Sequence, residues 1–261
     1  MTVPAFIADS YALAHPSWHH VLQKGIRAVA QADSSYLAEL EKDTFLPTHN
    51  RLFAAFSQPM DAVRYVLVGE GPYPREESAS GYCFMDGAVR DIWSDKGFSK
   101  PVNRATSLRN FLKMLLVTEN TLQPGNTSGE AMAEVARAVF SPDSPYIRQL
   151  DELQQAMLDK GFLLLNATLV FRKHVAPARE SRAWLPFLQT VMDALADHAV
   201  ASEKPLPVLV LWGKIAEKLT GIESVSRFPR VASEHPYNLS FIHNKDMQDF
   251  FGSMELFRKQ H

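Results

Sequence analysis

Short apolar runs alternate with amphipathic segments along the chain. The apolar runs are rich in bulky and β-branched residues and cover Tyr65–Gly69, Phe162–Asn166, Val208–Trp212 and Arg230–Ser233. Short runs of this kind separated by helical patterns are typical of parallel strands that are buried on both faces. The pattern therefore predicts an α/β fold with three layers, α/β/α, around a central four-stranded parallel sheet.

Helical periodicity predicts the layers that cover this sheet. Over residues 182–201, Leu185, Leu188, Val191, Met192 and Leu195 recur about every three to four residues and form one buried stripe. The looser segment 121–144 reads as a surface insertion around a short helix at Gly129–Val139. Further helices are expected over residues 17–32, 36–43, 107–117, 147–160, 214–220 and 246–259.

Length and composition narrow the class of protein. A chain of 261 residues with 46% hydrophobic content can bury a large core. We expect one domain over 1–261, with its core at about 60–258 and a helical segment at 1–59. No apolar run reaches the roughly 18 residues that span a bilayer, so we expect a cytoplasmic protein without membrane contact.

Charge and cysteine content limit the partners. The 27 basic and 29 acidic residues give a net charge of −2, so any nucleic-acid contact must use a local patch. The single cysteine, Cys83, excludes an internal disulfide, a multi-cysteine zinc site and a four-cysteine cluster from one chain. We expect a monomer in a reducing compartment, with no metal and no cofactor.

The first apolar run leads directly into a Gly/Pro-rich loop that ends at an aromatic residue, Phe84. In open parallel sheets, ligands bind outside the carboxyl ends of the strands, so a loop presenting Glu70, Tyr73 and Phe84 predicts a pocket. The segment resembles the water-activating loop of family 1 uracil-DNA glycosylases, which reads Gly-Gln-Asp-Pro-Tyr-His and is followed by an aromatic residue at a fixed distance.

Six positions of this loop match the family pattern without a gap: Gly69, Pro72, Tyr73, Gly81, Cys83 and Phe84. Three positions differ. Glu70 stands at the Gln position, Gly71 at the Asp position and Pro74 at the His position. The resemblance therefore implies the fold and the pocket, but the Asp that would activate water is replaced by Gly71.

The second apolar run ends on Asn166. An Asn at a strand end is often a turn former with its side chain in water. Its amide also offers one acceptor and two donors, which suits the Watson–Crick edge of a pyrimidine. The segment resembles the uracil-reading strand of the same family, and the likeness continues through Arg172 to Trp184.

The fourth run leads into Glu-His-Pro-Tyr-Asn-Leu-Ser over residues 234–240. A His beside a Pro can be an ordinary loop residue, but this segment resembles the His-Pro-Ser-Pro-Leu-Ser loop of the superfamily. Four positions match, namely His235, Pro236, Leu239 and Ser240, whereas Tyr237 and Asn238 replace the inner Ser-Pro. The resemblance implies that His235 faces uracil O2 and that Leu239 enters the duplex.

Two weaker similarities concern DNA phosphates. Ser107, before a predicted helix, resembles the serine of a loop that grips a phosphate, although an N-cap role explains it equally well. Lys214 follows Trp212-Gly213 at the position of the family's Gly-Ser loop. A lysine can bind a phosphate as a point charge or be merely solvated.

Together these resemblances imply a DNA glycosylase that hydrolyses the N-glycosidic bond of a flipped-out uracil or other deaminated base. Phe84 would stack on the base, Tyr73 would exclude the thymine methyl group, and Asn166 would pair with the base edge. His235 would stabilise the leaving base. With Gly71 unable to activate water, Glu70 is the candidate carboxylate, although it can also be a solvent-facing or helix-capping side chain.

Two other functions stay open at this point. The chain can be a catalytically weak or silent homologue that binds nucleic acid or a nucleobase through the same pocket. It can also be an enzyme acting on a free base or nucleotide, which the acidic net charge favours.

Overall fold

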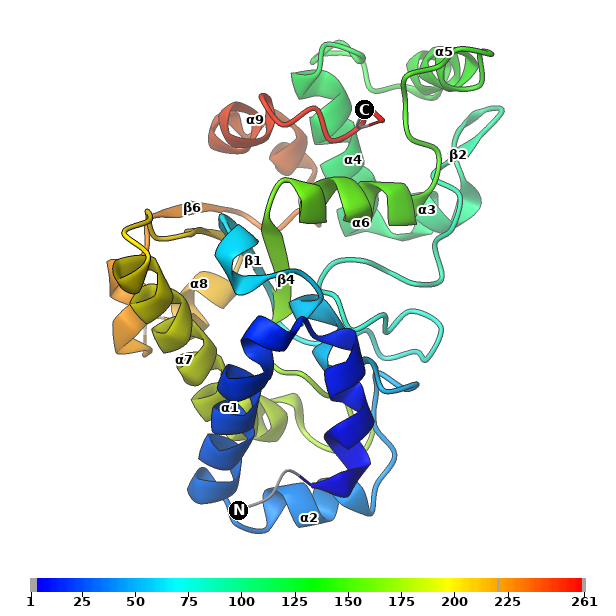
Figure 1. Cartoon of the computed structure of the whole chain (residues 1–261). Coiled ribbons are helices and arrows are strands. Elements are labelled where there is room, and N and C mark those ends of the chain that lie inside the picture. Colours follow the sequence, from blue (N-terminus) through cyan, green and yellow to red (C-terminus); the bar gives the residue numbers. More distant parts are fainter. Residues whose placement is uncertain (1–3, 220, 260–261) are drawn as a thin grey trace. The chain divides into compact units, whose positions relative to one another are not determined.

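The central element is a four-stranded parallel sheet with strand order β4-β1-β5-β6, flanked by helices (Figure 1). The computed structural model describes residues 4–219 and 221–259. The strands are β1 (Tyr65–Gly69), β4 (Phe162–Asn166), β5 (Val208–Trp212) and β6 (Arg230–Ser233). Their bounds agree with the four apolar runs, so the predicted fold class is confirmed.

The chain forms two compact units. One comprises residues 1–87, 161–210 and 215–230, and the other comprises 88–160, 211–214 and 231–261, apart from the few residues not described. The expectation of a single domain stays a prediction. Each unit is described below by itself.

The first unit is largely helical around β1 and β4. Its main contact joins α1 (His19–Ala32) to α7 (Pro177–Ala201), which lie side by side in Figure 1. A Cβ atom at Gly25 of α1 would lie 2.6 Å from the Phe187 ring, so this close packing needs a glycine. The remaining helices are η1 (Ala5–Leu13), η2 (Pro16–Trp18), α2 (Tyr36–Glu41), η3 (Arg51–Phe56), η4 (Met60–Ala62), α8 (Ile215–Leu219) and η5 (Glu223–Arg227).

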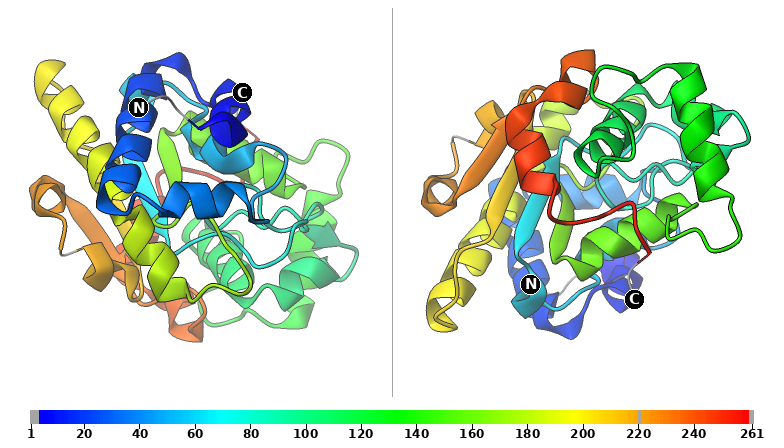
Figure 2. Two further views of the ribbon diagram at one scale, coloured as in Figure 1. Left: turned by 90° about the horizontal axis from the view of Figure 1, so that it is seen from below. Right: turned by 90° about the horizontal axis from the view of Figure 1, so that it is seen from above.

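The second unit is built around α4 (Thr106–Thr118), which packs against α9 (Lys245–Phe251) and η6 (Leu239–His243) (Figure 2). The Trp212 ring lies 5.4 Å from the Phe111 ring and 5.5 Å from the Phe241 ring, centroid to centroid. The unit also contains α3 (Lys100–Arg104), α5 (Gly129–Val139), α6 (Leu150–Asp159) and a hairpin of β2 (Trp93–Ser94) and β3 (Gly97–Phe98).

Helix positions follow the sequence expectation, whereas some ends differ. The helix expected from residue 182 begins at Pro177, because proline lacks the amide hydrogen that a first helical residue leaves unpaired. The last helix ends at Phe251 rather than 259, directly before Gly252. The expected helix 214–220 is observed as Ile215–Leu219, and Thr220 lies outside the described residues.

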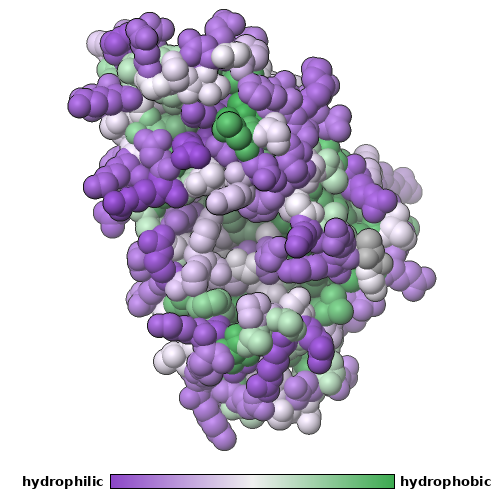
Figure 3. Space-filling model, turned by 180° about the vertical axis from the view of Figure 1, so that it is seen from behind, coloured by the Kyte–Doolittle hydropathy of each residue, from purple (hydrophilic) through white to green (hydrophobic). Residues whose placement is uncertain are grey.

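Apolar side chains are concentrated inside the protein. The face drawn in Figure 3 is predominantly hydrophilic and shows hydrophobic residues in small, separate groups. Over residues 4–219 and 221–259, none of the helices combines the length and the apolar character that a membrane crossing requires.

Candidate active site

The exits of β1 and β4 place Gly69 and Asn166 directly opposite each other, because the two strands pair in that register. A Cβ atom at Gly69 would lie 2.8 Å from Cys83 Cβ and 2.9 Å from Asn166 Oδ1. Only a glycine permits this approach. The amide group of Asn166 is therefore packed against the backbone of β1, at the start of the loop that the sequence singled out.

Asn166 has an unmet hydrogen-bonding capacity. The residue is only 4% exposed, so its side chain does not extend into water as that of a simple turn former would. The side-chain amide makes no hydrogen bond to any residue that the structure describes. Buried polar groups normally have a partner, and an unpaired amide at a strand exit is suited to receive one from a ligand.

Tyr73, near the start of the loop, contacts Phe84 at its end. The Tyr73 hydroxyl donates to the Phe84 carbonyl oxygen at 3.4 Å. Burial, and next the nearby carboxylate of Asp86, raise the pKa of Tyr73, so the phenol stays neutral. Phe84 has a φ of +64°, in the left-handed region. Bulky residues adopt this conformation at a cost, and such strain concentrates at functional sites.

Cys83 anchors the aromatic end of the loop to the sheet. Its amide N–H donates to the Leu164 carbonyl oxygen of β4 at 3.0 Å, and its thiol donates to the Leu67 carbonyl oxygen of β1 at 3.1 Å. Burial raises the pKa of this thiol, which keeps it protonated, as is typical of a structural cysteine. Among the residues the structure describes, no cluster of His, Cys, Asp and Glu has the arrangement of a metal site.

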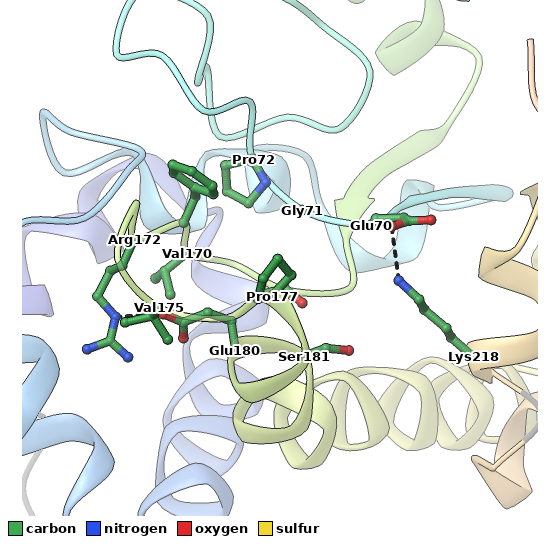
Figure 4. A pocket seen from close by; sticks show the side chains of 12 residues that line it. Glu70, Gly71, Pro72, Val170, Arg172, Val175, Pro177, Glu180, Ser181 and Lys218 are labelled. Atoms are coloured by element: carbon green, nitrogen blue, oxygen red, sulfur yellow. Dashed lines mark hydrogen bonds and ion pairs between the residues drawn. The ribbon is translucent and has the colours of Figure 1, made fainter. Parts of the chain in front are cut away.

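Glu70 forms an ion pair that the sequence did not predict. Lys218 of α8 donates to Glu70 Oε2 at 3.0 Å, and the two side chains point toward each other in Figure 4. The Glu70 side chain is 61% exposed and that of Lys218 is 45% exposed. The Glu70 carbonyl oxygen accepts from the Thr168 amide N–H at 3.2 Å, which fixes the backbone. No local sequence pattern pairs Lys218 with Glu70, because the two residues are 148 positions apart in the chain.

A cavity of about 200 Å³ opens beside this loop. In Figure 4, Glu70 and Lys218 lie at one end, and Arg172 and Glu180 lie at the other. Tyr73, Phe84 and Asn166 do not line it, so Glu70 does not share this cavity with the base-reading candidates. It is lined by Glu70, Gly71, Pro72, Thr168, Val170, Phe171, Arg172, Val175, Pro177, Glu180, Ser181 and Lys218.

The cavity leaves room at Gly71 for a larger residue. A Cβ atom there would lie 3.5 Å from both Cβ and the carbonyl oxygen of Thr168, an ordinary van der Waals distance. Gly71 is also not among the glycines with positive φ. Neither space nor backbone conformation therefore requires glycine at the position where the resemblance expects Asp.

His235 lies in the second unit, after β6. The amide N–H of Tyr237 donates to His235 Nδ1 at 3.1 Å, so the neutral ring carries its proton on Nε2. Gly213 has a φ of +67°, and a Cβ atom there would lie 2.9 Å from His235 Cβ. The loop after β5 thus packs closely against the histidine and orients a ring that can donate through Nε2.

Asn110 of α4 holds the loop that carries His235 and Leu239. Its Nδ2 donates to the carbonyl oxygens of Pro236, Tyr237 and Asn238 at 2.8, 3.3 and 3.4 Å. Leu239 is 67% exposed, and Ser240 is also exposed. Asn238 stands where the family loop has its second proline, so the loop lacks the rigidity that this proline would give. The buried side-chain amide of Asn110 holds the loop instead. No local sequence pattern reveals this contact.

The two phosphate-contact candidates are also in the second unit. The residue preceding α4 is Ala105, so the N-cap explanation of Ser107 is wrong. Ser107 instead lies in the first turn, where helix amides suit an anion. Lys214 is exposed and forms no ion pair with any residue of the described ranges.

Known proteins resemble the chain over most of its length. No family model matches it. The uracil-DNA glycosylase of Corynebacterium glutamicum is 30% identical over 243 residues, which are 92% of this chain and 84% of that protein. Uracil-DNA glycosylase 2 of Streptomyces coelicolor is 29% identical and covers 93% of this chain and 87% of its own length.

Solved structures agree with these sequence relatives. The crystal structure of wild-type UNG from Nitratifractor salsuginis covers 100% of both chains at 36% identity, with a TM-score of 0.86. Mimivirus uracil-DNA glycosylase, at 16% identity and a TM-score of 0.55, shares the fold. The chain belongs to the uracil-DNA glycosylase family.

Proposed function

We propose that this protein removes uracil from DNA by hydrolysing the N-glycosidic bond. The observation that carries the proposal is the buried Asn166 amide, which has no partner among the described residues and faces Gly69 at the exits of β1 and β4. The names of the relatives at similar length support uracil in DNA as the substrate. We further propose that the protein acts as a monomer.

Residues of the first unit recognise the base. The target nucleotide must leave the stack, because its C1′ atom and base edges are inaccessible inside a duplex. The Asn166 amide then pairs with the amide edge of uracil, and Phe84 stacks on the ring. Tyr73 blocks the position that the 5-methyl group of thymine would occupy. A site that hydrogen-bonds its substrate in this way can reject analogues by roughly 10⁴–10⁵.

Departure of the base is assisted by His235. As the bond between C1′ and the base nitrogen breaks, its electron pair moves to uracil and negative charge grows on O2. The protonated Nε2 of the neutral imidazole donates to this oxygen, because Nδ1 is already an acceptor for the Tyr237 amide. A preorganised donor of this kind contributes roughly 10²–10³ in rate.

Water activation is assigned to Glu70, the residue that directly precedes Gly71 in the sequence. A water molecule adds through its oxygen to C1′ and gives its proton to the Glu70 carboxylate, which contributes roughly 10²–10⁴ in rate. Lys218 acts as a positioning residue, because its ammonium group holds one carboxylate oxygen at 3.0 Å.

DNA contacts must be local, because the net charge of −2 gives no general attraction to phosphate. Three groups contact the backbone phosphates: the first turn of α4 with Ser107, the exposed Lys214 and the exposed Ser240. Leu239 enters the space that the flipped nucleotide vacates.

The test uses single- and double-stranded oligonucleotides that contain uracil, hypoxanthine or xanthine. Abasic sites are cleaved with alkali, and the products show which base has left. We expect uracil release by the wild type and a loss of roughly 10²–10⁴ in Glu70→Gln. Lys218→Met should lower kcat while leaving KM nearly unchanged, and Lys218→Arg should restore part of the rate.

A matched control is Lys204→Met. Lys204 is also an exposed lysine of the first unit, 49% exposed and paired with Asp61 at 2.6 Å, but it does not line the cavity. Its loss should leave uracil release unchanged. If the wild type releases no base from any strand but still binds the oligonucleotides, the proposed reaction is wrong and a catalytically silent binding protein takes its place.

A further inference from the structure

Two large apolar side chains on one loop are exposed. Tyr237 is 68% exposed and Leu239 is 67% exposed, more than any other large hydrophobic residue that the structure describes. Leaving both in water forgoes the gain from hydrophobic burial. The resemblance to the family explains Leu239 as a duplex wedge, but it gives no role to Tyr237, which stands where the family loop has a serine.

The exposure of Tyr237 does not result from a loose loop. The Asn238 amide N–H donates to the His235 carbonyl oxygen at 2.9 Å, and Asn110 binds the Tyr237 carbonyl oxygen. Phe241 and Ile242 follow directly and are buried. The backbone is therefore fixed on both sides while the phenol ring stays in solvent, which lowers the entropic cost of binding through that ring.

Exposed groups of the second unit suit nucleic acid. Lys214, directly after the glycine that packs on His235, is an exposed cation without an ion pair in the described ranges. An exposed aromatic ring on a fixed backbone can stack on a base, and an exposed lysine of the same unit can contact a phosphate of a nucleic-acid strand.

We propose that Tyr237 is a second DNA-contacting residue, whose ring stacks on a nucleobase that flanks the flipped nucleotide. The inference rests on the proposed function and adds a contact to it. Tyr237 and Leu239, two residues apart, then both contact the DNA. Leu239 fills the space that the flipped nucleotide vacates, and Tyr237 stacks on the adjacent base. The backbone N–H of Tyr237 fixes the His235 tautomer at the same time, so DNA binding and histidine orientation share one rigid loop.

The first experiment measures the dissociation constant for a duplex that contains a non-cleavable 2′-fluoro-2′-deoxyuridine. Tyr237→Ala should weaken binding about 5- to 150-fold, the range expected for loss of one base–aromatic stack. Tyr237→Phe keeps the ring and should stay within about 2-fold of the wild type. All substitutions preserve the backbone N–H to His235. The control is Phe140→Ala, which removes another exposed aromatic ring of the second unit, 47% exposed.

The second experiment identifies the contact directly. A 5-iodouracil placed beside the analogue is photo-cross-linked to the protein, and the attached peptide is identified by mass spectrometry. A cross-link at Tyr237 supports the inference. Wild-type affinity in Tyr237→Ala together with cross-links only elsewhere overturns it, even when uracil release proves the glycosylase reaction. A cross-link at Tyr237 without release of any base supports the contact and refutes the reaction instead.

Discussion

Three residues at the strand exits bear on the proposed chemistry because each of them lacks a particular group or partner. Gly69 lacks a Cβ atom and so lets Asn166 Oδ1 approach the backbone of β1. Asn166 lacks a hydrogen-bond partner among the described residues and so is available to a ligand. Gly71 lacks the carboxylate that the family resemblance implies, which moves the question of water activation to Glu70.

Replacing Asn166 with Ala should abolish the preference for uracil with little effect on stability. Because the amide has no partner in the described ranges, its removal breaks no internal hydrogen bond, and the free energy of unfolding should change by less than about 1 kcal/mol. The measurement pairs base-release assays on uracil and thymine oligonucleotides with a melting curve. A lower melting temperature with unchanged uracil release would make Asn166 a structural residue.

Replacing Gly71 with Asp should accelerate uracil release by up to roughly 10²–10⁴ without altering the base preference. The site tolerates the side chain, since the nearest atoms to a Cβ lie at 3.5 Å. The contrasting variant is Gly69→Ala, in which the Cβ would meet Cys83 and Asn166 within 3 Å, so binding and activity should both fall. Equal rates for wild type and Gly71→Asp would show that a carboxylate at this position contributes nothing.

At the scale of elements, helix α4 makes important contacts at both its N-terminal and its C-terminal end. Near its start, Ser107 lies in the first turn, and Asn110 fixes the loop after β6. At its other end, Glu119 accepts from the Phe257 amide N–H at 3.0 Å, while its second carboxylate oxygen is buried without a hydrogen-bond partner in the described ranges. A carboxylate at a helix C-terminus also opposes the helix dipole.

Glu119 should make stability depend on pH. Burial raises its pKa from 4.5 to about 6. Between these values the folded protein holds more protons than the unfolded chain, so the free energy of unfolding falls as pH rises through about 4.5 to 6 and stays lower above it. The effect is on the order of 1–2 kcal/mol. In urea titrations at several pH values, Glu119→Gln should lack this decrease; an identical pH profile would contradict the assignment.

At the scale of the whole molecule, a buried polar network joins segments far apart in the chain. Arg172 Nε donates to Glu180 at 2.6 Å, the Tyr36 hydroxyl donates to the same carboxylate, and Trp184 Nε1 donates to the Tyr36 hydroxyl at 2.8 Å. Burial lowers the pKa of Arg172, but its hydrogen bond to Glu180 and the Glu180 charge outweigh this and raise it overall. The network connects the segment after β4, which carries Arg172, to α2 and α7.

Breaking this network should be costly. Arg172→Ala leaves Glu180 buried without its cation and should lower the free energy of unfolding by about 3–5 kcal/mol. The control is Arg179→Ala, which removes an exposed partner of Glu39 at 2.6 Å and should cost less than about 1 kcal/mol. Urea unfolding followed by circular dichroism measures both, and similar losses in the two variants would contradict a structural role for the buried pair.

The sequence alone determined the four strands and their fold class, because short strand-like runs between helical patterns are a local signal. The apolar runs of β1, β4 and β5 are largely buried, whereas β6 is an edge strand that is partly exposed. The sequence also placed Asn166, His235 and the Glu70 loop at strand exits. Helix ends were less certain, as at Pro177 and Phe251, because local capping and packing decide them.

Only the tertiary structure decided which side chains meet. The pairing of Glu70 with Lys218, the hold of Asn110 on the His235 loop and the place of Ser107 inside α4 depend on contacts between residues distant in sequence or on helix register. A sequence pattern reports whether a position is buried or exposed, since that depends on its own polarity and period. It does not report the partner across space, because the partner is chosen by the packing of the whole chain.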